Sequence, residues 1–243
     1  MPDNPIIRIV KENIDRIEAP EVAISFSGGI DSTLLAVLAR QSKKVTLYTI
    51  NFEERGEDIH YARKAAQELG LPLVEVKITR EELEKNFPKA LELAKGDVVK
   101  AHVLAPLIKL VKEVKEKDLL FGAGTEELFM GYDRHYSFPK EELKQRLKEE
   151  FEALERNEIR ALRELCESEG KRAHFPYYDK RLLEYVHSFP EEVIAKDKER
   201  KKHLLRESAK GIVPEFVRTR KKKALQYGTK VVEVFRKARR AQR

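Results

Sequence analysis

The stretch of sequence that decides the fold is a short phosphate-loop-like string between an apolar strand pattern and an apolar helix pattern: Val22-Ala23-Ile24-Ser25-Phe26-Ser27-Gly28-Gly29-Ile30-Asp31-Ser32. Where a strand turns directly into a helix, free backbone N–H groups and the helix dipole favour an anion. Two adjacent glycines let the backbone approach that anion closely. The string therefore indicates a loop that holds phosphate.

The side chains of this loop suit a phosphate bound with a metal. Ser27 and Ser32 can donate hydroxyls to phosphate oxygens, whereas Asp31 would repel phosphate unless it held Mg²⁺. The alternative is a plain Gly-Gly turn in which Asp or Ser caps the next helix. The string lacks the GxxxxGK[ST] spacing of a kinase-type loop.

Strand and helix patterns alternate on both sides of the loop. A helix pattern over residues 6–17 precedes VAISFS, and TLLAVLAR leads to a second strand over 45–51. A helix over 57–69 stops at Gly70, LVEVKI is a third strand, and DLLFGAG near Asp118 is a fourth. This order predicts an α/β fold with a parallel, doubly wound sheet of five or so strands, whose ligand site lies beyond the carboxyl ends of the strands. SGGIDS and GAGTEE both leave strands there.

The second half of the chain is predicted to be mostly helical. Residues 140–170 have the pattern of one long charged helix, and prolines at 176, 190 and 214 break the remainder. We therefore divide the chain into an α/β nucleotide-binding part, 1–125, and a helical part, 126–243, that packs on it as one body. The basic run VVEVFRKARRAQR at the end is either a solvated helix or a contact for RNA or an acidic partner.

Composition excludes several classes of protein. The 243 residues are 41% hydrophobic and 37% charged, with no apolar run of membrane-spanning length and no signal-peptide pattern, so we expect a cytoplasmic protein without a membrane partner. Cys166 is the single cysteine, which excludes an internal disulfide and multi-cysteine metal sites.

The six histidines form no i, i+4 pair that could bind a metal from one face of a helix. Few Met, no Trp and abundant Lys and Glu fit a thermophile. The net charge of +7 suits either a nucleic acid or a triphosphate.

Several motifs together resemble a known family. SGGIDS resembles the fingerprint of the PP-loop ATP-pyrophosphatases, and the whole pattern resembles the synthetase domain of asparagine synthetases. The matching segments, in family order, are FGAGTEELFMGY from Phe121, FPYYD from Phe175 followed by LLEY, KHLLR from Lys202 followed by GIVP, and RKK from Arg220.

The resemblance implies an ATP-dependent ligase that uses ATP and Mg²⁺. Phosphates and metal would be held by Ser25, Ser27, Gly28, Gly29, Asp31 and Ser32, and adenine would lie against Ile50, Asn51 and Phe52. Gly122 would face the ribose or the adenylated intermediate, and Glu126 would approach Mg²⁺ or substrate. Lys202 and Lys222 would be catalytic, stabilising charge on the α-phosphate and pyrophosphate.

The sequence departs from the family at two positions of the second motif and at its start. Ala123 stands where the family has a glutamate that deprotonates ammonium, so Glu126 or Glu127 would have to take that role. Phe121 replaces a small serine and suggests a reshaped acceptor pocket. Position 2 is Pro2 where the family's glutaminase domain has a cysteine, so we expect nitrogen from ammonia, an amine or a separate subunit.

Three functions remain open at this point. The first is a ligase that adenylates a small acceptor for attack by ammonia or an amine. The second is a tRNA-modifying enzyme that adenylates a base carbonyl, with the basic tail on the RNA backbone. The third is a nucleotide-binding scaffold without turnover. The sequence identifies neither the acceptor nor the oligomeric state, and an oligomer is compatible with it.

Overall fold

The computed structural model describes residues 4–52 and 57–221, and its centre is a five-stranded sheet in which every pairing is parallel. The strand order is β3-β2-β1-β4-β5. The strands are β1 (Glu21–Ser25), β2 (Lys44–Phe52), β3 (Leu73–Ile78), β4 (Asp118–Leu120) and β5 (Arg172–His174). β1 lies between β2 and β4, so the loop that follows β1 emerges near the middle of the sheet.

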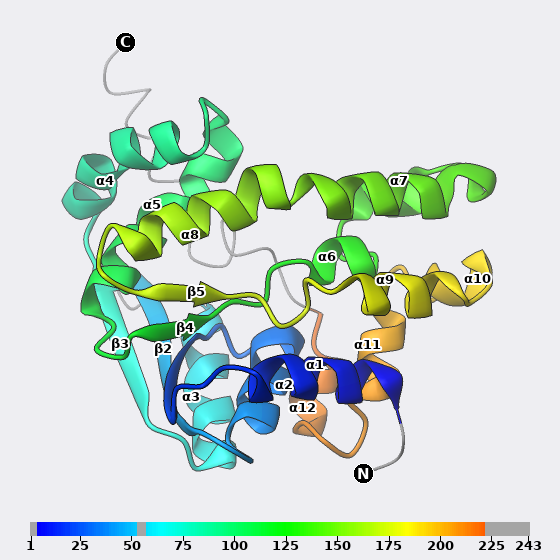
Figure 1. Ribbon diagram of the computed structural model, residues 1–243, viewed down its shortest axis with the longest axis horizontal. Helices are drawn as coiled ribbons and strands as arrows, with labels where there is room; N and C mark the ends of the chain where they lie inside the picture. The colour runs from blue at the N-terminus through cyan, green and yellow to red at the C-terminus, as the bar shows by residue number, and fades with distance from the viewer. Residues whose placement is uncertain (1–3, 53–56, 222–243) are drawn as a thin grey trace.

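Helices cover both faces of this sheet (Figure 1). One face carries α1 (Pro5–Asp15), α2 (Ile30–Ala39) and α3 (Glu57–Leu69), and the other carries α4 (Arg80–Leu93), α5 (Val98–Glu113) and α8 (Arg160–Glu167). Along β1, Val22 and Ile24 are in the first core and Ala23 is in the second. This alternation is the two-residue period of a strand buried on both sides.

The remaining elements follow β4 and pack around the end of the sheet. They are α6 (Thr125–Leu128), the 3₁₀ turn η1 (Asp133–Ser137), α7 (Lys140–Ala153), the π-helical turn η2 (Glu155–Ile159), α9 (Lys180–His187), α10 (Glu191–Ile194), α11 (His203–Ser208) and α12 (Glu215–Thr219). α12 contacts α2 and α9 contacts α1. The second half of the chain therefore packs directly on the helices that flank the first strand.

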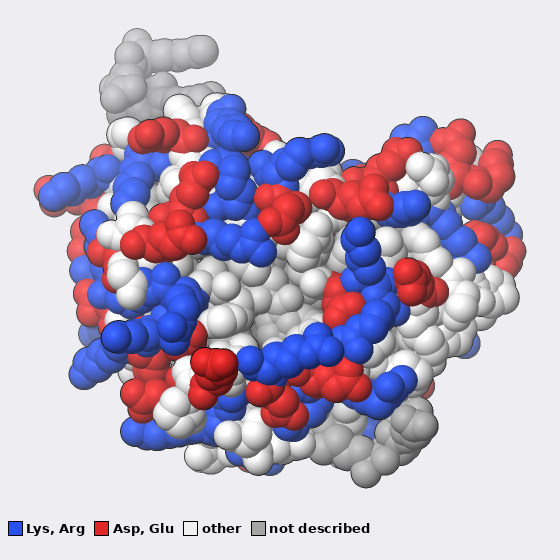
Figure 2. All heavy atoms as spheres, viewed as in Figure 1, with Lys and Arg blue, Asp and Glu red and all other residues white. Residues whose placement is uncertain are grey.

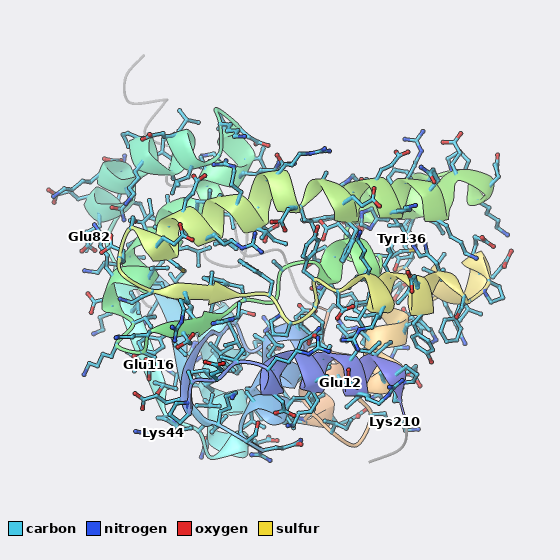
Figure 3. All side chains as sticks on the ribbon, in the orientation of Figure 1. Glu12, Lys44, Glu82, Glu116, Tyr136 and Lys210 are labelled. Atoms are coloured by element: carbon cyan, nitrogen blue, oxygen red, sulfur yellow. The ribbon has the colours of Figure 1, made fainter. Side chains whose placement is uncertain are left out.

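Side-chain caps and ion pairs fix how the helices are placed. Glu82 caps α4 in a capping box with Thr79 and also pairs with Lys109 of α5 at 2.9 Å. Glu12 of α1 accepts a hydrogen bond from Arg181 of α9 at 2.6 Å. Glu12 and Glu82 are labelled in Figure 3, at well-separated places on the molecule. α1 itself begins with an Asn4 cap followed by a proline.

The predicted architecture is confirmed, and the structure adds details that the patterns did not single out. The four predicted strands and the helices over 6–17 and 57–69 are present. The fifth strand, β5, comes from the second half of the chain, which is otherwise helical in the part that the structure describes. The predicted long helix over 140–170 is interrupted by the π-helical turn η2. No helix within the described residues is long and apolar enough to cross a membrane.

Candidate functional site

The loop after β1 is packed so closely on α3 that only glycine fits at its centre. Gly28 has φ +65°, in the left-handed region, and a Cβ there would lie 2.7 Å from the backbone nitrogen of Ala62. The loop stays attached to the sheet because Phe26 N–H donates to the carbonyl of Tyr48 at 2.7 Å. The loop backbone is therefore held between β2 and α3.

Hydroxyl groups organise the inside of this loop. The backbone N–H of Ser27 donates to Ser32 Oγ at 3.2 Å, and the two serine hydroxyls lie 3.3 Å apart. Gly29 occupies the N-cap of α2 and no side chain caps this helix, so the alternative in which Asp or Ser serves as the cap is wrong. Asp31 lies instead in the first turn of α2. The first N–H groups of α2 therefore receive no side-chain cap.

A buried lysine joins the loop to the second motif. Lys202 Nζ lies 2.8 Å from Asp31 Oδ1, 2.9 Å from Glu126 Oε1 and 3.0 Å from Thr125 Oγ1. Lys202 is 6% exposed. Burial opposes its charge, but Asp31 and Glu126 outweigh that effect and raise the pKa of Lys202 above its ordinary value. The ammonium is thus charged and aimed at the phosphate loop.

The backbone that carries this lysine has an uncommon conformation. Lys201 has φ +59° and Lys202 has φ +52°, so two consecutive non-glycine residues are left-handed. Each such residue costs on the order of 1–3 kcal/mol and persists only where its surroundings enforce it. Strain of this kind concentrates at functional sites.

Glycines of the second motif make room for the charged groups. A Cβ on Gly122 would lie 3.3 Å from the Cβ of Asp31, so this glycine faces the loop. A Cβ on Gly131 would fall on Glu126 Oε2 and would lie 2.8 Å from Lys202 Cε. The position of the Glu126 carboxylate therefore depends on the absence of a side chain at residue 131.

Two further polar side chains support the same cluster. Thr125 donates its hydroxyl to the carbonyl of Gly122 at 3.0 Å while it accepts from Lys202. Tyr177 donates its hydroxyl to the backbone carbonyl of Asp31 at 2.9 Å. Both residues lie inside the motifs quoted from the sequence, but the motifs give them no role, since their contacts join positions far apart in the chain.

Two carboxyl groups beside Glu126 have raised pKa values. Glu127 is 5% exposed, and burial, with Glu158 and Glu126 nearby, raises its pKa to about 8. Burial and Glu126 raise the pKa of Glu158 to about 6. Glu158 lies on the π-helical turn η2, a feature often found at functional sites. At neutral pH Glu127 is mainly protonated and Glu158 mainly ionised.

The remaining predicted site residues lie at the ends of β1 and β2 or outside the described residues. Ile50, Asn51 and Phe52 form the carboxyl end of β2 and are buried, and Asn51 Nδ2 donates to Glu75 at 2.9 Å. Ser25 is the last residue of β1. Lys222 lies outside the described residues, as do Pro2 and the basic run near the end of the chain.

Phe121 and two polar side chains elsewhere in the chain have packing or structural roles. Phe121 is buried and stacks on Phe175 with ring centroids 5.8 Å apart, so packing accounts for its bulk. His102 packs on Phe87, and Asp179 both caps α9 and pairs with Arg181. Within the described ranges no group of three or more His, Cys, Asp or Glu residues could hold a metal ion.

The two carboxylates that were predicted to hold Mg²⁺ both pair with the same buried lysine. Asp31 and Glu126 converge on one ammonium, Lys202 Nζ, so they lie close enough to share a cation. Mg²⁺ is usually bound by one or two protein carboxylates together with substrate phosphates and water. Two carboxylates beside a phosphate loop fit that pattern.

Known proteins match this chain along most of its length. The asparagine synthase family model matches residues 15–174 and 164–242. The chain belongs to the asparagine synthase family. Within the family, a glutamine-hydrolyzing asparagine synthetase of Methanocaldococcus jannaschii is 28% identical over 86% of this chain and 46% of that protein. The human glutamine-hydrolyzing asparagine synthetase is 30% identical over 83% of this chain and 38% of that protein.

The chain spans less than half the length of these relatives. A solved structure, the NH3-dependent NAD synthetase of Campylobacter jejuni, is 17% identical and covers 86% of this chain and 94% of its own, with a TM-score of 0.37. At that TM-score the likeness carries no argument about function. The asparagine synthase family assignment therefore rests on the sequence matches.

Proposed function

We propose that this asparagine synthase family protein cleaves ATP to AMP and pyrophosphate and transfers the AMP to a carboxylate acceptor, which ammonia or an amine then attacks. The observation that carries the proposal is the meeting of Lys202 with Asp31 and Glu126 at the phosphate loop. A buried lysine that reaches the start of α2 would face the phosphates of a nucleotide bound there.

The proposed reaction has two steps. In the first, an acceptor carboxylate oxygen attacks the α-phosphorus, the bond to the bridging oxygen breaks, and pyrophosphate leaves. In the second, the nitrogen attacks the acyl carbon, AMP leaves with the former acceptor oxygen, and the nitrogen gives up a proton.

The residues of the site would each support part of this reaction. The backbone of Gly28 and Gly29 would hold phosphate oxygens, and Lys202 would stabilise charge that develops on them. Asp31 and Glu126 would hold Mg²⁺, which neutralises phosphate charge when it is bound. Among the candidates for the proton acceptor, Glu126 is paired with Lys202, whereas Glu127, whose pKa burial raises to about 8, is a stronger base than an ordinary carboxylate in its ionised fraction.

The nitrogen donor is a separate part of the proposal. The relatives named above hydrolyse glutamine according to their names, but this chain covers less than half of each. We propose that nitrogen reaches the site as ammonia or an amine, with a separate glutaminase subunit as one source.

The tRNA alternative needs a basic surface, and three of the described cations that neighbour Lys202 in sequence or follow α12 are paired with carboxylates. Arg200 pairs with Asp197, Lys201 with Asp133 and Lys221 with Glu199. On the face shown in Figure 2, Lys and Arg are interspersed with Asp and Glu around a hollow with few charges. The described residues therefore give RNA no basic surface on this face, while the basic run that the tRNA alternative relies on lies outside them, so the assay below decides between the two acceptors.

Release of AMP and pyrophosphate from Mg-ATP tests the proposal. It is measured with pooled amino acids plus ammonium, with bulk tRNA, and without an acceptor, for the native chain and for Asp31→Asn. Asp15→Asn, which removes an exposed carboxylate of α1, is the matched control.

The expected result is AMP formation that needs the amino-acid pool, survives Asp15→Asn and disappears in Asp31→Asn. Stimulation by tRNA alone, lost at higher salt, would move the assignment to RNA modification. Tight ATP binding without AMP under every condition would refute the enzyme and leave the scaffold. Adding glutamine in place of ammonium, with and without a glutaminase, separates the two nitrogen sources.

A further inference from the structure

Arg206 is a buried arginine to which neither the motifs nor the proposed reaction gives a role. It lies in the last turn of α11 and is 7% exposed. Burial lowers its pKa from the ordinary arginine value. Within the described part of the chain, its side-chain hydrogen bonds go to backbone carbonyls. A buried guanidinium bonded to carbonyls fixes the path of the backbone segments that supply them.

The first of these segments carries the site lysine. Arg206 Nε donates to the carbonyl of Lys201 at 2.8 Å. That carbonyl belongs to the peptide between the two left-handed residues, Lys201 and Lys202. Because left-handed backbone is unfavourable for residues with a side chain, the turn needs outside support. The guanidinium provides such support one peptide away from Lys202.

The second segment is the carboxyl end of α12. Arg206 Nη1 donates to the carbonyl of Arg218 and lies 3.5 Å from that of Val217. These carbonyls belong to the last turn of α12, where a cation is favourable. The guanidinium thereby fixes the direction in which the chain leaves α12 toward Arg220.

The chain that leaves α12 is tied back to the phosphate loop. The guanidinium of Arg220 lies over the ring of Tyr61, 3.5 Å from its centroid, and Lys64 lies 4.2 Å from the centroid of Phe216. Tyr61 and Phe216 stack with centroids 6.5 Å apart. The backbone of Tyr61 is also among the atoms packed on Gly28. α12 is thus attached both to Arg206 and to the helix that supports the loop.

We propose that Arg206 is a positioning residue that holds Lys202 against the phosphate loop by clamping its left-handed turn to the end of α12. Its three hydrogen bonds span two segments that the sequence separates by sixteen residues or more. A lysine at this position would keep the charge but not the planar fork that reaches both segments. The expected effect on kcat for AMP formation rests on the proposed function, whereas the expected position of Lys202 does not.

Two variants of the full-length chain test the clamp, Arg206→Met and Arg206→Lys, with Arg200→Met as the matched control. Arg200 precedes Lys201 by one residue, but it is exposed and pairs with Asp197. Two quantities are measured for each variant. One is the rate at which an amine-reactive reagent labels Lys202, followed by mass spectrometry under conditions where urea titration shows the chain folded. The other is kcat and KM for AMP formation.

In Arg206→Met we expect Lys202 to be labelled about tenfold faster and kcat to fall about 100-fold, with KM for Mg-ATP changed less than threefold. Misplacing a reacting group by about 1 Å has effects of that size on turnover. Arg206→Lys should lose about tenfold in kcat, and Arg200→Met should match the native chain in both measurements.

Native labelling and native kcat in a folded Arg206→Met would overturn the proposal. If Arg206→Met does not fold, Arg206→Lys decides by the same two measurements, and native values in that variant overturn the clamp. If the native chain forms no AMP, the proposed function fails but the labelling rates still decide on the clamp.

Discussion

The close approach between Gly28 and α3 predicts how much an alanine would destabilise the phosphate loop. Gly28 and Gly70 have nearly the same positive φ, +65° and +61°. A Cβ at residue 28 would meet the backbone of residues 61 and 62 at 2.7–2.8 Å, whereas a Cβ at residue 70 has nothing within 4 Å. Gly70→Ala therefore measures the cost of left-handed backbone alone.

The left-handed conformation costs about 1–2 kcal/mol for a residue with a Cβ. The overlap with α3 adds roughly 1–3 kcal/mol, as overpacking usually does, because the atoms met are backbone and cannot rotate away. Gly70→Ala should thus lower the free energy of unfolding by about 1–2 kcal/mol and Gly28→Ala by about 2–5 kcal/mol. In a domain of this size each kcal/mol corresponds to about 2–4 °C in Tm.

Urea titration and thermal melting of both variants provide the comparison. ATP-dependent AMP formation should survive Gly70→Ala and fall in Gly28→Ala, since the loop must move to accommodate the methyl group. Equal destabilisation by the two alanines would refute the reasoning, because it would show that the contact with α3 restricts nothing.

Three further predictions concern the charged cluster. Gly131→Ala should displace the Glu126 carboxylate and lower kcat for AMP formation at least tenfold. Tm should shift by less than about 4 °C, because the end of a flexible side chain can move at a small cost in free energy. An unchanged kcat would contradict this prediction. Lys202→Met should lower the free energy of unfolding by roughly 2 kcal/mol at pH 8. This loss is smaller than the loss of a fully buried ion pair would be, because Glu126 is partly exposed. A urea titration that shows no loss would contradict it. Folded Glu127 keeps its proton up to about pH 8, whereas unfolded Glu127 releases it near 4.5, so the free energy of unfolding declines as the pH rises from 4.5 to 8. Glu127→Gln should remove that decline, which is on the order of 2–4 kcal/mol. Parallel pH profiles of the native protein and the variant would exclude this contribution.

The phosphate loop and the sheet around it could be predicted from sequence because their signals are local. SGGIDS lies directly after β1, and the apolar runs on either side have the periods of a strand and a helix. β5 gave no such signal, because Arg172–His174 is three residues long and none of them is buried. A strand this short is defined by its pairing with β4 and not by its composition.

The geometry around Lys202 depended on contacts that a sequence does not display. The resemblance of KHLLR to a family motif was enough to predict Lys202 as a site residue. The left-handed backbone of Lys201 and Lys202 has no sequence signal, since glycine or asparagine is expected at such positions. Thr125 and Tyr177 support the cluster across 77 and 146 residues of chain. Only the tertiary structure brings such pairs together.

The π-helical turn η2 joins α7 to α8, and its length sets which way the side chains of α8 face. Leu143, Leu147 and Phe151 of α7 lie in one hydrophobic core, while Leu162 and Leu165 of α8 lie in the other. Each residue of an α-helix turns the chain by about 100°, so the extra residue in a π turn rotates everything after it by that amount. Deleting one residue from Glu155–Ile159 would make the helix regular and would turn α8 away from the core that it fills. The irregular turn thus acts as a phase shift, and its length can change only if one of the two cores changes with it.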